Sequence, residues 1–163
     1  RGTVKVKLRG SDEFFVLQDG QQLPMGSTLD TSKGRVNLVA AANTTGKTQK
    51  AWFYQGVFKV NQSKGRKPLT TLTMTGRLQC AKGATANAAA KKKRKRRLWG
   101  DGKGRFRTKG KRSAATVVGT KWLVEDRCNG TLTVVKRGVV KVRDFKKRKT
   151  VTVRARHSYF ARG

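Results

Sequence analysis

Near the start of the chain the residues run Val4-Lys5-Val6-Lys7-Leu8, and near its end they run Val151-Thr152-Val153-Arg154. In both stretches apolar residues alternate with polar or cationic ones. Successive side chains of a β-strand point to opposite faces, so the alternation places apolar residues on one face and cations on the other. The pattern predicts a folded all-β domain with a cationic exterior and argues against a disordered basic tail.

The charge balance is extreme: 40 Lys and Arg residues stand against 8 Asp and Glu in 163 residues, for a formal net charge of +32. Such a charge repels itself and favours anionic partners: nucleic acid, a cell-envelope polymer, acidic lipid or a complementary protein. The alternative is a charge that serves solubility or life in high salt. The hydrophobic fraction of 36% is low, but it suffices for the thin core of a sandwich, barrel or β-solenoid.

No apolar stretch reaches the roughly 18 residues of a membrane helix, so we expect no transmembrane segment. The chain begins at Arg1 without an initiator Met, which points to a processed or partial product. The lack of a visible signal peptide is therefore uninformative.

Cys80 and Cys128 are the only cysteines. Cys128 shares strand parity with Trp122 and Val124, and Cys80 likewise shares parity with the apolar residues before it. We therefore expect both thiols to point inward from strands, and we favour a disulfide between them. The alternative is two buried free thiols in a reducing compartment. Two cysteines and one histidine, His157, cannot complete a four-ligand structural zinc site, and no metal or cofactor is predicted.

Residues 81–97 break the alternation, because an alanine-rich stretch leads into a basic run with no apolar stripe. We expect a basic loop near 81–105. The predicted organisation is a first β unit over 1–80, an alanine-rich then basic loop over 81–103, and a second β unit over 104–163, all in one compact domain. Gly100-Asp101-Gly102-Lys103-Gly104 lacks the spacing of a phosphate loop and is interpreted as a tight cationic turn. Asn129-Gly130 predicts a hairpin.

The basic run can bind phosphates independently of sequence, and Trp99 beside it can stack on a base. The alternative is a solvated loop whose Trp99 packs into the core. The predicted polyanion-binding residues are Lys91, Lys92, Lys93, Arg94, Lys95, Arg96, Arg97, Lys103 and Arg105.

No catalytic constellation is visible. Glu125 and Asp126 are neighbours on a predicted strand, so they point to opposite faces and cannot act as a pair. Asp126 is expected to pair with an arginine, as a buried carboxylate requires. Ser158 follows His157 directly and faces the other way. We therefore expect a protein that is not an enzyme.

The second half carries a series of short motifs, listed in chain order: Gly104-Arg105-Phe106-Arg107-Thr108, then residues 115–124, 130–142 and 151–155. With these motifs it resembles the FecR-like domain of bacterial envelope proteins. The first half looks like a similar unit through residues 23–31 and 34–38. At the end of the pattern Arg156 stands where the family usually has glycine.

The resemblance implies two stacked FecR-like units with a β-helix, β-solenoid or sandwich architecture, an extracytoplasmic location and no enzymatic activity. We therefore expect a structural or binding module of a bacterial cell surface or secreted assembly. Its partner would be an anionic polymer (cell-wall polymer or nucleic acid) or an acidic protein subunit. The alternative is an intracellular protein that binds nucleic acid without sequence preference.

Overall fold

The computed structural model describes residues 1–80 and 95–163, and every regular element in these ranges is a β-strand, which confirms the all-β prediction. The strands follow one another along the chain as β1 (Gly2–Lys7), β2 (Phe15–Val16), β3 (Thr28–Ala41), β4 (Thr48–Tyr54), β5 (Val57–Gln62), β6 (Thr70–Met74), β7 (Lys95–Lys109), β8 (Ser113–Arg127), β9 (Gly130–Arg137), β10 (Val139–Asp144), β11 (Lys149–Arg154) and β12 (Ser158–Arg162).

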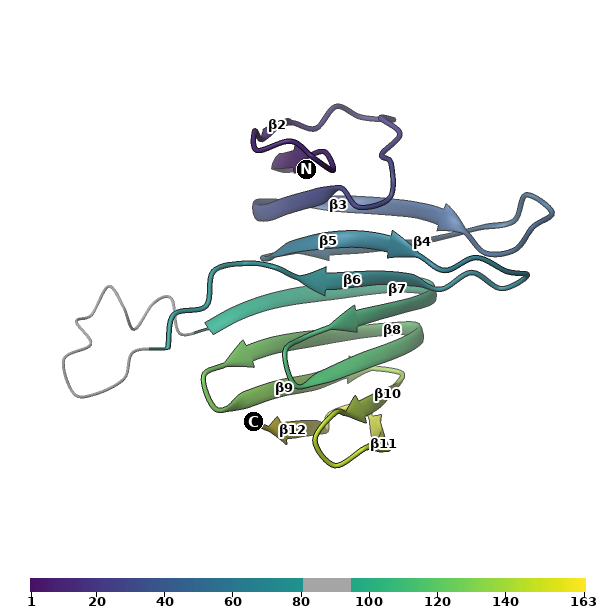
Figure 1. The fold of residues 1–163 in the computed structure, drawn as a ribbon. Coiled ribbons are helices and arrows are strands. Elements are labelled where there is room, and N and C mark those ends of the chain that lie inside the picture. The colour runs from purple at the N-terminus through teal and green to yellow at the C-terminus, as the bar shows by residue number, and fades with distance from the viewer. Residues whose placement is uncertain (81–94) are drawn as a thin grey trace.

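Five strands close into a ring. β3 pairs with β5 and β4, β5 pairs with β6, β6 pairs with β7, and β7 pairs with β4. The β6–β7 ladder is parallel, whereas the other ladders between described strands are antiparallel. β1 and β2 extend the sheet beyond β3, and β8 to β12 extend it beyond β7, so the two termini lie at opposite ends of the stack (Figure 1). The sheet therefore continues across the expected boundary between the two halves.

The β7–β8 hairpin is the longest unit, with 15 residues in each strand. Its register shifts between Gly102 and Arg105. Before this bulge β7 pairs with β4, and after it β7 pairs with β6. Bulges bend a strand and increase its twist, which lets β7 border two different strands and close the ring.

The core contains the inward row of these strands. Phe53, Phe58, Phe106 and Trp122 are fully buried. The ring of Phe53 contacts the other three, with centroid distances of 5.8 Å to Phe58, 5.4 Å to Phe106 and 5.9 Å to Trp122. The indole N–H of Trp122 donates to the hydroxyl of Thr108 at 3.1 Å, so the buried polar atom is satisfied. The apolar inner row that the alternation predicts is present, and aromatic side chains form much of it.

The predicted loop over 95–105 is wrong. β7 begins at Lys95, and Gly100 to Gly104 lie in the middle of that strand instead of in a turn. Pairing with β8 on one side and β4 on the other satisfies the backbone there, and this outweighs the local glycine and charge signals. The rest of the expected loop, residues 81–94, lies outside the described residues.

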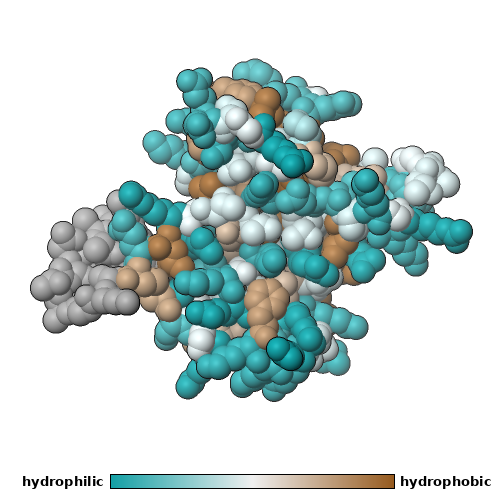
Figure 2. Space-filling view, viewed as in Figure 1, coloured by the Kyte–Doolittle hydropathy of each residue, from teal (hydrophilic) through white to brown (hydrophobic). Residues whose placement is uncertain are grey.

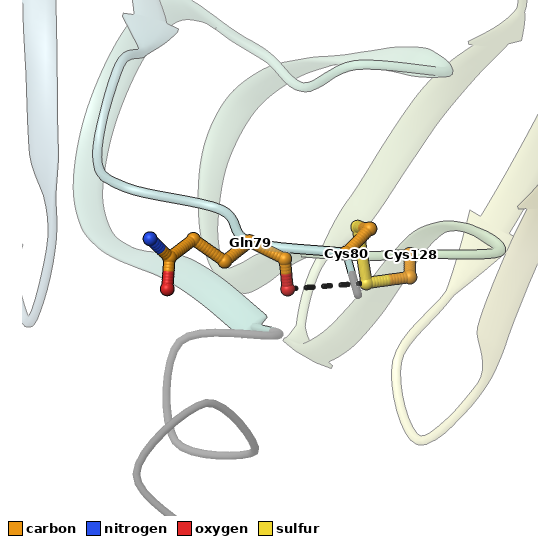
Figure 3. The surroundings of a disulfide bond; sticks show 3 residues. All are labelled: Gln79, Cys80 and Cys128. Carbon is orange, nitrogen blue, oxygen red and sulfur yellow. Dashed lines mark hydrogen bonds between the residues drawn. A yellow bond between two sulfur atoms is a disulfide. The ribbon is translucent and has the colours of Figure 1, made fainter. Parts of the chain in front are cut away.

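The Cys80–Cys128 disulfide is confirmed, with a Cα–Cα distance of 5.4 Å across a sequence separation of 48 residues (Figure 3). The carbonyl oxygen of Gln79 lies 3.6 Å from the sulfur of Cys128. The predicted inward orientation is wrong, because both cysteines are exposed. β6 ends at Met74 and β8 ends before Cys128, so neither cysteine belongs to a strand.

The predicted β8–β9 hairpin is present, but its turn is displaced by one residue. It lies at residues 128–129 instead of Asn129-Gly130, and Gly130 already belongs to β9, where it pairs with Arg127. Arg156 has a φ of 68°, in the left-handed region that glycine favours. The turn before β12 thus has the conformation of a glycine position.

Gly100 is a specific requirement of the core. It lies directly opposite Trp122 in the β7–β8 ladder, and a Cβ at this position would overlap the indole ring. We expect Gly100→Ala to lower the free energy of unfolding by about 2 kcal/mol, because the ring has no space to retreat. Urea denaturation followed by circular dichroism measures this change.

The matched control is Gly76→Ala, where the added Cβ would meet its nearest neighbour at 3.6 Å, an ordinary contact. We expect that variant to unfold within about 0.5 kcal/mol of the parent. Equal stability of the two variants would contradict the packing of Trp122 against Gly100.

Candidate polyanion-binding face

The register of three central strands decides which side chains share the outer surface. Tyr54 of β4 pairs with Trp99 of β7, and Trp99 pairs with Leu123 of β8. The residues adjacent to these three along the chain, Phe53, Gly100 and Trp122, belong to the buried row. Because alternate residues share a face, the outer row of these strands carries the cations and a second set of aromatic residues.

We call this surface the basic–aromatic face. It is the outer side of β3, β4, β7 and β8, and its members are Arg35, Asn37, Val39, Lys50, Trp52, Tyr54, Lys95, Arg97, Trp99, Asp101, Lys103, Lys121, Leu123, Glu125 and Arg127.

Aromatic rings occupy the middle of the basic–aromatic face. Tyr54 and Trp99 stack with centroids 6.2 Å apart and planes inclined by 7°. The guanidinium of Arg35 lies 4.8 Å from the ring centroid of Trp52. Trp52, Tyr54 and Trp99 are all half-buried. The alternative that Trp99 packs into the core is therefore wrong, and its ring is available at the outer surface.

Two carboxylates bind part of the surrounding cations. Asp101 forms an ion pair with the guanidinium of Arg137 at 2.7 Å, and it lies 3.8 Å from the ammonium of Lys121. Glu125, which is 4% exposed, binds Arg127 at 2.8 Å and Arg97 at 3.3 Å. These contacts hold the cationic side chains in place but also neutralise part of their charge.

Arg96 has a structural role. Its side chain points to the face opposite Arg97 and binds the fully buried Asp126 at 2.7 Å, which confirms that Asp126 pairs with an arginine. It also donates to the carbonyl oxygen of Gly76 at 3.0 Å. Asp126 further accepts hydrogen bonds from the Lys111 backbone N–H and the Thr131 hydroxyl. Arg96 is therefore not available to a ligand.

Other predicted cations are exposed and available. Lys95 and Lys103 lie on the basic–aromatic face, and Arg105 follows the bulge. In the described part of the chain no carboxylate lies within ion-pair distance of these three. Lys91, Lys92, Lys93 and Arg94 lie outside the described residues.

The sequence analysis missed the contribution of the first half. Strand pairing brings Lys50 directly opposite Lys103 of β7, and it places Arg35 on the same face one strand further away. The alternation of Lys50, Trp52 and Tyr54 was the signal that could have identified them. It did not show which other strand would lie alongside, because that depends on long-range register.

Figure 2 shows polar side chains over most of one side of the molecule, with apolar ones scattered between them. No helix in residues 1–80 or 95–163 has the length and hydropathy that a membrane crossing requires.

Titratable groups with clear pKa shifts lie elsewhere. Tyr159 donates its hydroxyl to Asp144 at 2.7 Å. Burial tends to raise the pKa of Asp144, but hydrogen bonds from the Lys147 backbone and from Tyr159 hold that pKa below its ordinary value. The same hydrogen bond raises the pKa of Tyr159. This pair ties the end of β10 to β12 and has a structural role.

The residues considered for catalysis are not assembled into a site. Glu125 binds arginines on the outer surface while Asp126 binds Arg96 on the inner side, so they do point to opposite faces. His157 is exposed, and its Nδ1 lies 3.0 Å from the carbonyl oxygen of Ala155. No group of three or more potential metal ligands occurs among the residues that the structure describes.

No family model, curated protein or solved structure matches this chain. Its function is therefore inferred from the geometry of its own residues.

The contrast between Arg96 and its neighbour can be tested directly. We expect Arg96→Met to lower the free energy of unfolding by about 3 kcal/mol, because it leaves the buried Asp126 without its cation. Lys95→Met removes the same charge from an exposed position and is expected to change stability by about 0.5 kcal/mol or less. Urea denaturation measures both values. An unchanged free energy of unfolding in Arg96→Met would contradict the structural role of Arg96.

Proposed function

We propose that this chain is a non-enzymatic binding module that holds an anionic polymer against the basic–aromatic face. The net charge of +32 draws polyanions to the whole surface. The register of β3, β4 and β7 then lines up several cations along neighbouring strands. A linear polymer with regularly repeated charges fits such rows better than a compact ligand does.

The main support comes from one cross-strand pair. Lys50 and Lys103 lie directly opposite each other, and both are exposed. Like charges in directly opposed positions destabilise a sheet, by about 0.2–1 kcal/mol. An anionic group between the two ammonium groups would convert this repulsion into attraction. The pair costs stability in the free protein and becomes favourable only when a ligand is bound.

The expected contacts are independent of monomer sequence. Lysine and arginine side chains at the surface contact the charged backbone of a polymer, which positions the ligand but carries no sequence information. Affinity is therefore expected to fall steeply with salt.

An extracytoplasmic location is part of the proposal. Disulfides persist in oxidising compartments, and the Cys80–Cys128 bridge is exposed to reductants. The FecR-like resemblance, which stays a prediction together with its β-solenoid architecture, implies the same compartment. A structural or binding module of a bacterial cell surface or secreted assembly fits both arguments, with a wall polymer or an acidic subunit as its partner.

A second candidate ligand is single-stranded nucleic acid. The half-buried Trp99 and Tyr54 lie between Lys95, Arg97 and Lys103 on the same face. Bases stack on such rings with about 1–3 kcal/mol each, independently of sequence. A polymer that carries only phosphates gains nothing from these aromatic residues, so the two ligands can be distinguished.

We expect Lys103→Ser to weaken binding of a labelled 20-mer of deoxythymidine several-fold and to reduce the salt slope by about 0.7. The free energy of unfolding is expected to stay equal or rise, because the repulsion with Lys50 disappears. Fluorescence anisotropy between 50 and 300 mM salt measures the slope (roughly the range over which such contacts weaken).

Lys64→Ser is the charge-matched control, since Lys64 is exposed in the β5–β6 connection and lies outside the basic–aromatic face. Equal slopes for the two variants would place the ligand elsewhere. An abasic strand of the same length tests the second candidate. If bases stack on Trp99, the parent protein binds the deoxythymidine strand more tightly than the abasic strand, and Trp99→Ala removes this difference in affinity. Equal binding of both strands by the parent protein supports contacts to phosphates alone.

The proposed compartment has its own test. We expect both cysteines of protein isolated from its native source to resist alkylation unless a reductant is added, because they form the Cys80–Cys128 bridge. Mass analysis of the alkylated protein measures this. Modification of both thiols without reductant would favour the intracellular nucleic-acid-binding alternative.

A further inference from the structure

The second half of β3 is an edge of the sheet. On one side Val36 to Ala41 pair with β4. On the other side, pairing with β1 stops at Gly34. Beyond it, the Arg35 N–H donates to the carbonyl of Arg1 at 2.8 Å, and the amino group of Arg1 donates to the carbonyl of Arg35 at 3.2 Å. Within residues 1–80 and 95–163, no strand pairs with that side of Val36 to Ala41.

The hydrogen-bond pattern shows which backbone groups this edge presents. The Ala42 N–H bonds to the carbonyl of Lys47 on the β4 side, so residues 40, 38 and 36 also face β4 by alternation. Asn37 and Val39 consequently direct their N–H and C=O groups away from β4. The carbonyl of Ala41 is already occupied by the side-chain amides of Gln49 and Gln62.

A groove of about 990 Å³ adjoins this edge. The segment that contains Leu17 and Leu23 forms one wall, and the inward side chains of β3 form another. Its apolar lining includes Leu17, Leu23, Val36, Leu38, Ala40 and Val60. A strand placed beside β3 could therefore direct every second side chain into an apolar space.

The edge also lacks the usual protection against pairing. Sheet edges are commonly blocked by lysine, proline or a bulge. Residues 36–46 contain no charged residue, although the chain carries 40 lysines and arginines. Val39 is 63% exposed at the middle of the unpaired segment.

We propose that this edge binds an extended acidic peptide segment of another protein by strand addition. Main-chain hydrogen bonds to Asn37 and Val39 supply affinity, and alternate apolar side chains of the peptide fill the groove. Acidic residues between them face the outer side, where Arg35 lies. A second copy of this chain is disfavoured as occupant, because two molecules of charge +32 repel each other. The site adjoins the basic–aromatic face, because Arg35 belongs to that face and Val39 pairs with Lys50, but it uses backbone groups that the face does not.

The probe is a labelled, end-capped hexapeptide of alternating Glu and Val. Two further peptides have the same charge but carry N-methyl groups on alternate amides. In one peptide the methyl groups block the N–H groups of one edge of the strand, and in the other peptide they block those of the opposite edge. We expect one methylated peptide to bind like the parent and the other to fail. Anisotropy titrations measure this, and a purely electrostatic contact would treat all three peptides alike, which overturns the proposal.

The matched protein variants are Val39→Pro and Val39→Ala. Proline removes only the N–H that points away from β4, and such positions tolerate it. We expect about tenfold weaker peptide binding by Val39→Pro and little change by Val39→Ala. Near-UV circular dichroism, to which the buried Trp122 contributes, checks the fold of both variants. Equal affinities in folded variants would refute the site.

Hydrogen exchange provides a readout that needs no variant. We expect the peptide to protect the amides of Asn37 and Val39 in the parent protein. A lack of protection at saturating peptide would overturn the proposal. So would a concentration-dependent dimer that Val39→Pro abolishes, since the occupant would then be a second copy.

Discussion

The contact between Gly100 and Trp122 fixes the relation between the inside and the outside of this protein. The indole fits only because the facing residue has no side chain, and a shift of register by one residue would bring Trp99 or Asp101 to that position. Every side chain of β7 would then exchange faces. The same contact that closes the core therefore keeps Trp99 and Lys103 at the surface, and the bulge after Gly102 lets β7 continue along β6 without losing this register.

Charge compensation is concentrated on one hairpin of the sheet. Three of the eight acidic residues, Asp101, Glu125 and Asp126, lie on the β7–β8 hairpin. Each binds at least one arginine. Asp126 and Glu125 are buried, so their partners are held firmly, whereas Lys50 and Lys103 are left opposed without a carboxylate. The hairpin thus separates cations that maintain the fold from cations that can bind a ligand.

Local alternation predicted the all-β class, the inward Trp122 and the arginine partner of Asp126, because these features depend on the parity of a single strand. It failed for residues 95–105, where glycines and like charges indicate a loop and only pairing with two other strands makes β7 favourable. The disulfide was predicted correctly for a partly wrong reason: the two cysteines do meet, but beyond the ends of β6 and β8 instead of in the core. The outer row formed by Arg35, Lys50 and Trp99 required the register of three strands, and no pattern within one strand contains that information.

β3 carries two surfaces of opposite character. Arg35 belongs to the basic–aromatic face. Residues 37–41, which follow it along the same strand, present an uncharged edge. An anionic polymer gains little at that edge, because binding there requires amide donors and acceptors at strand spacing together with apolar side chains for the groove. A peptide strand, conversely, leaves Lys103 of β7 uncovered, since β4 lies between β7 and the edge, whereas Lys50 lies directly beside Val39. The two proposed sites therefore select ligands by different chemistry, although they adjoin where Val39 pairs with Lys50.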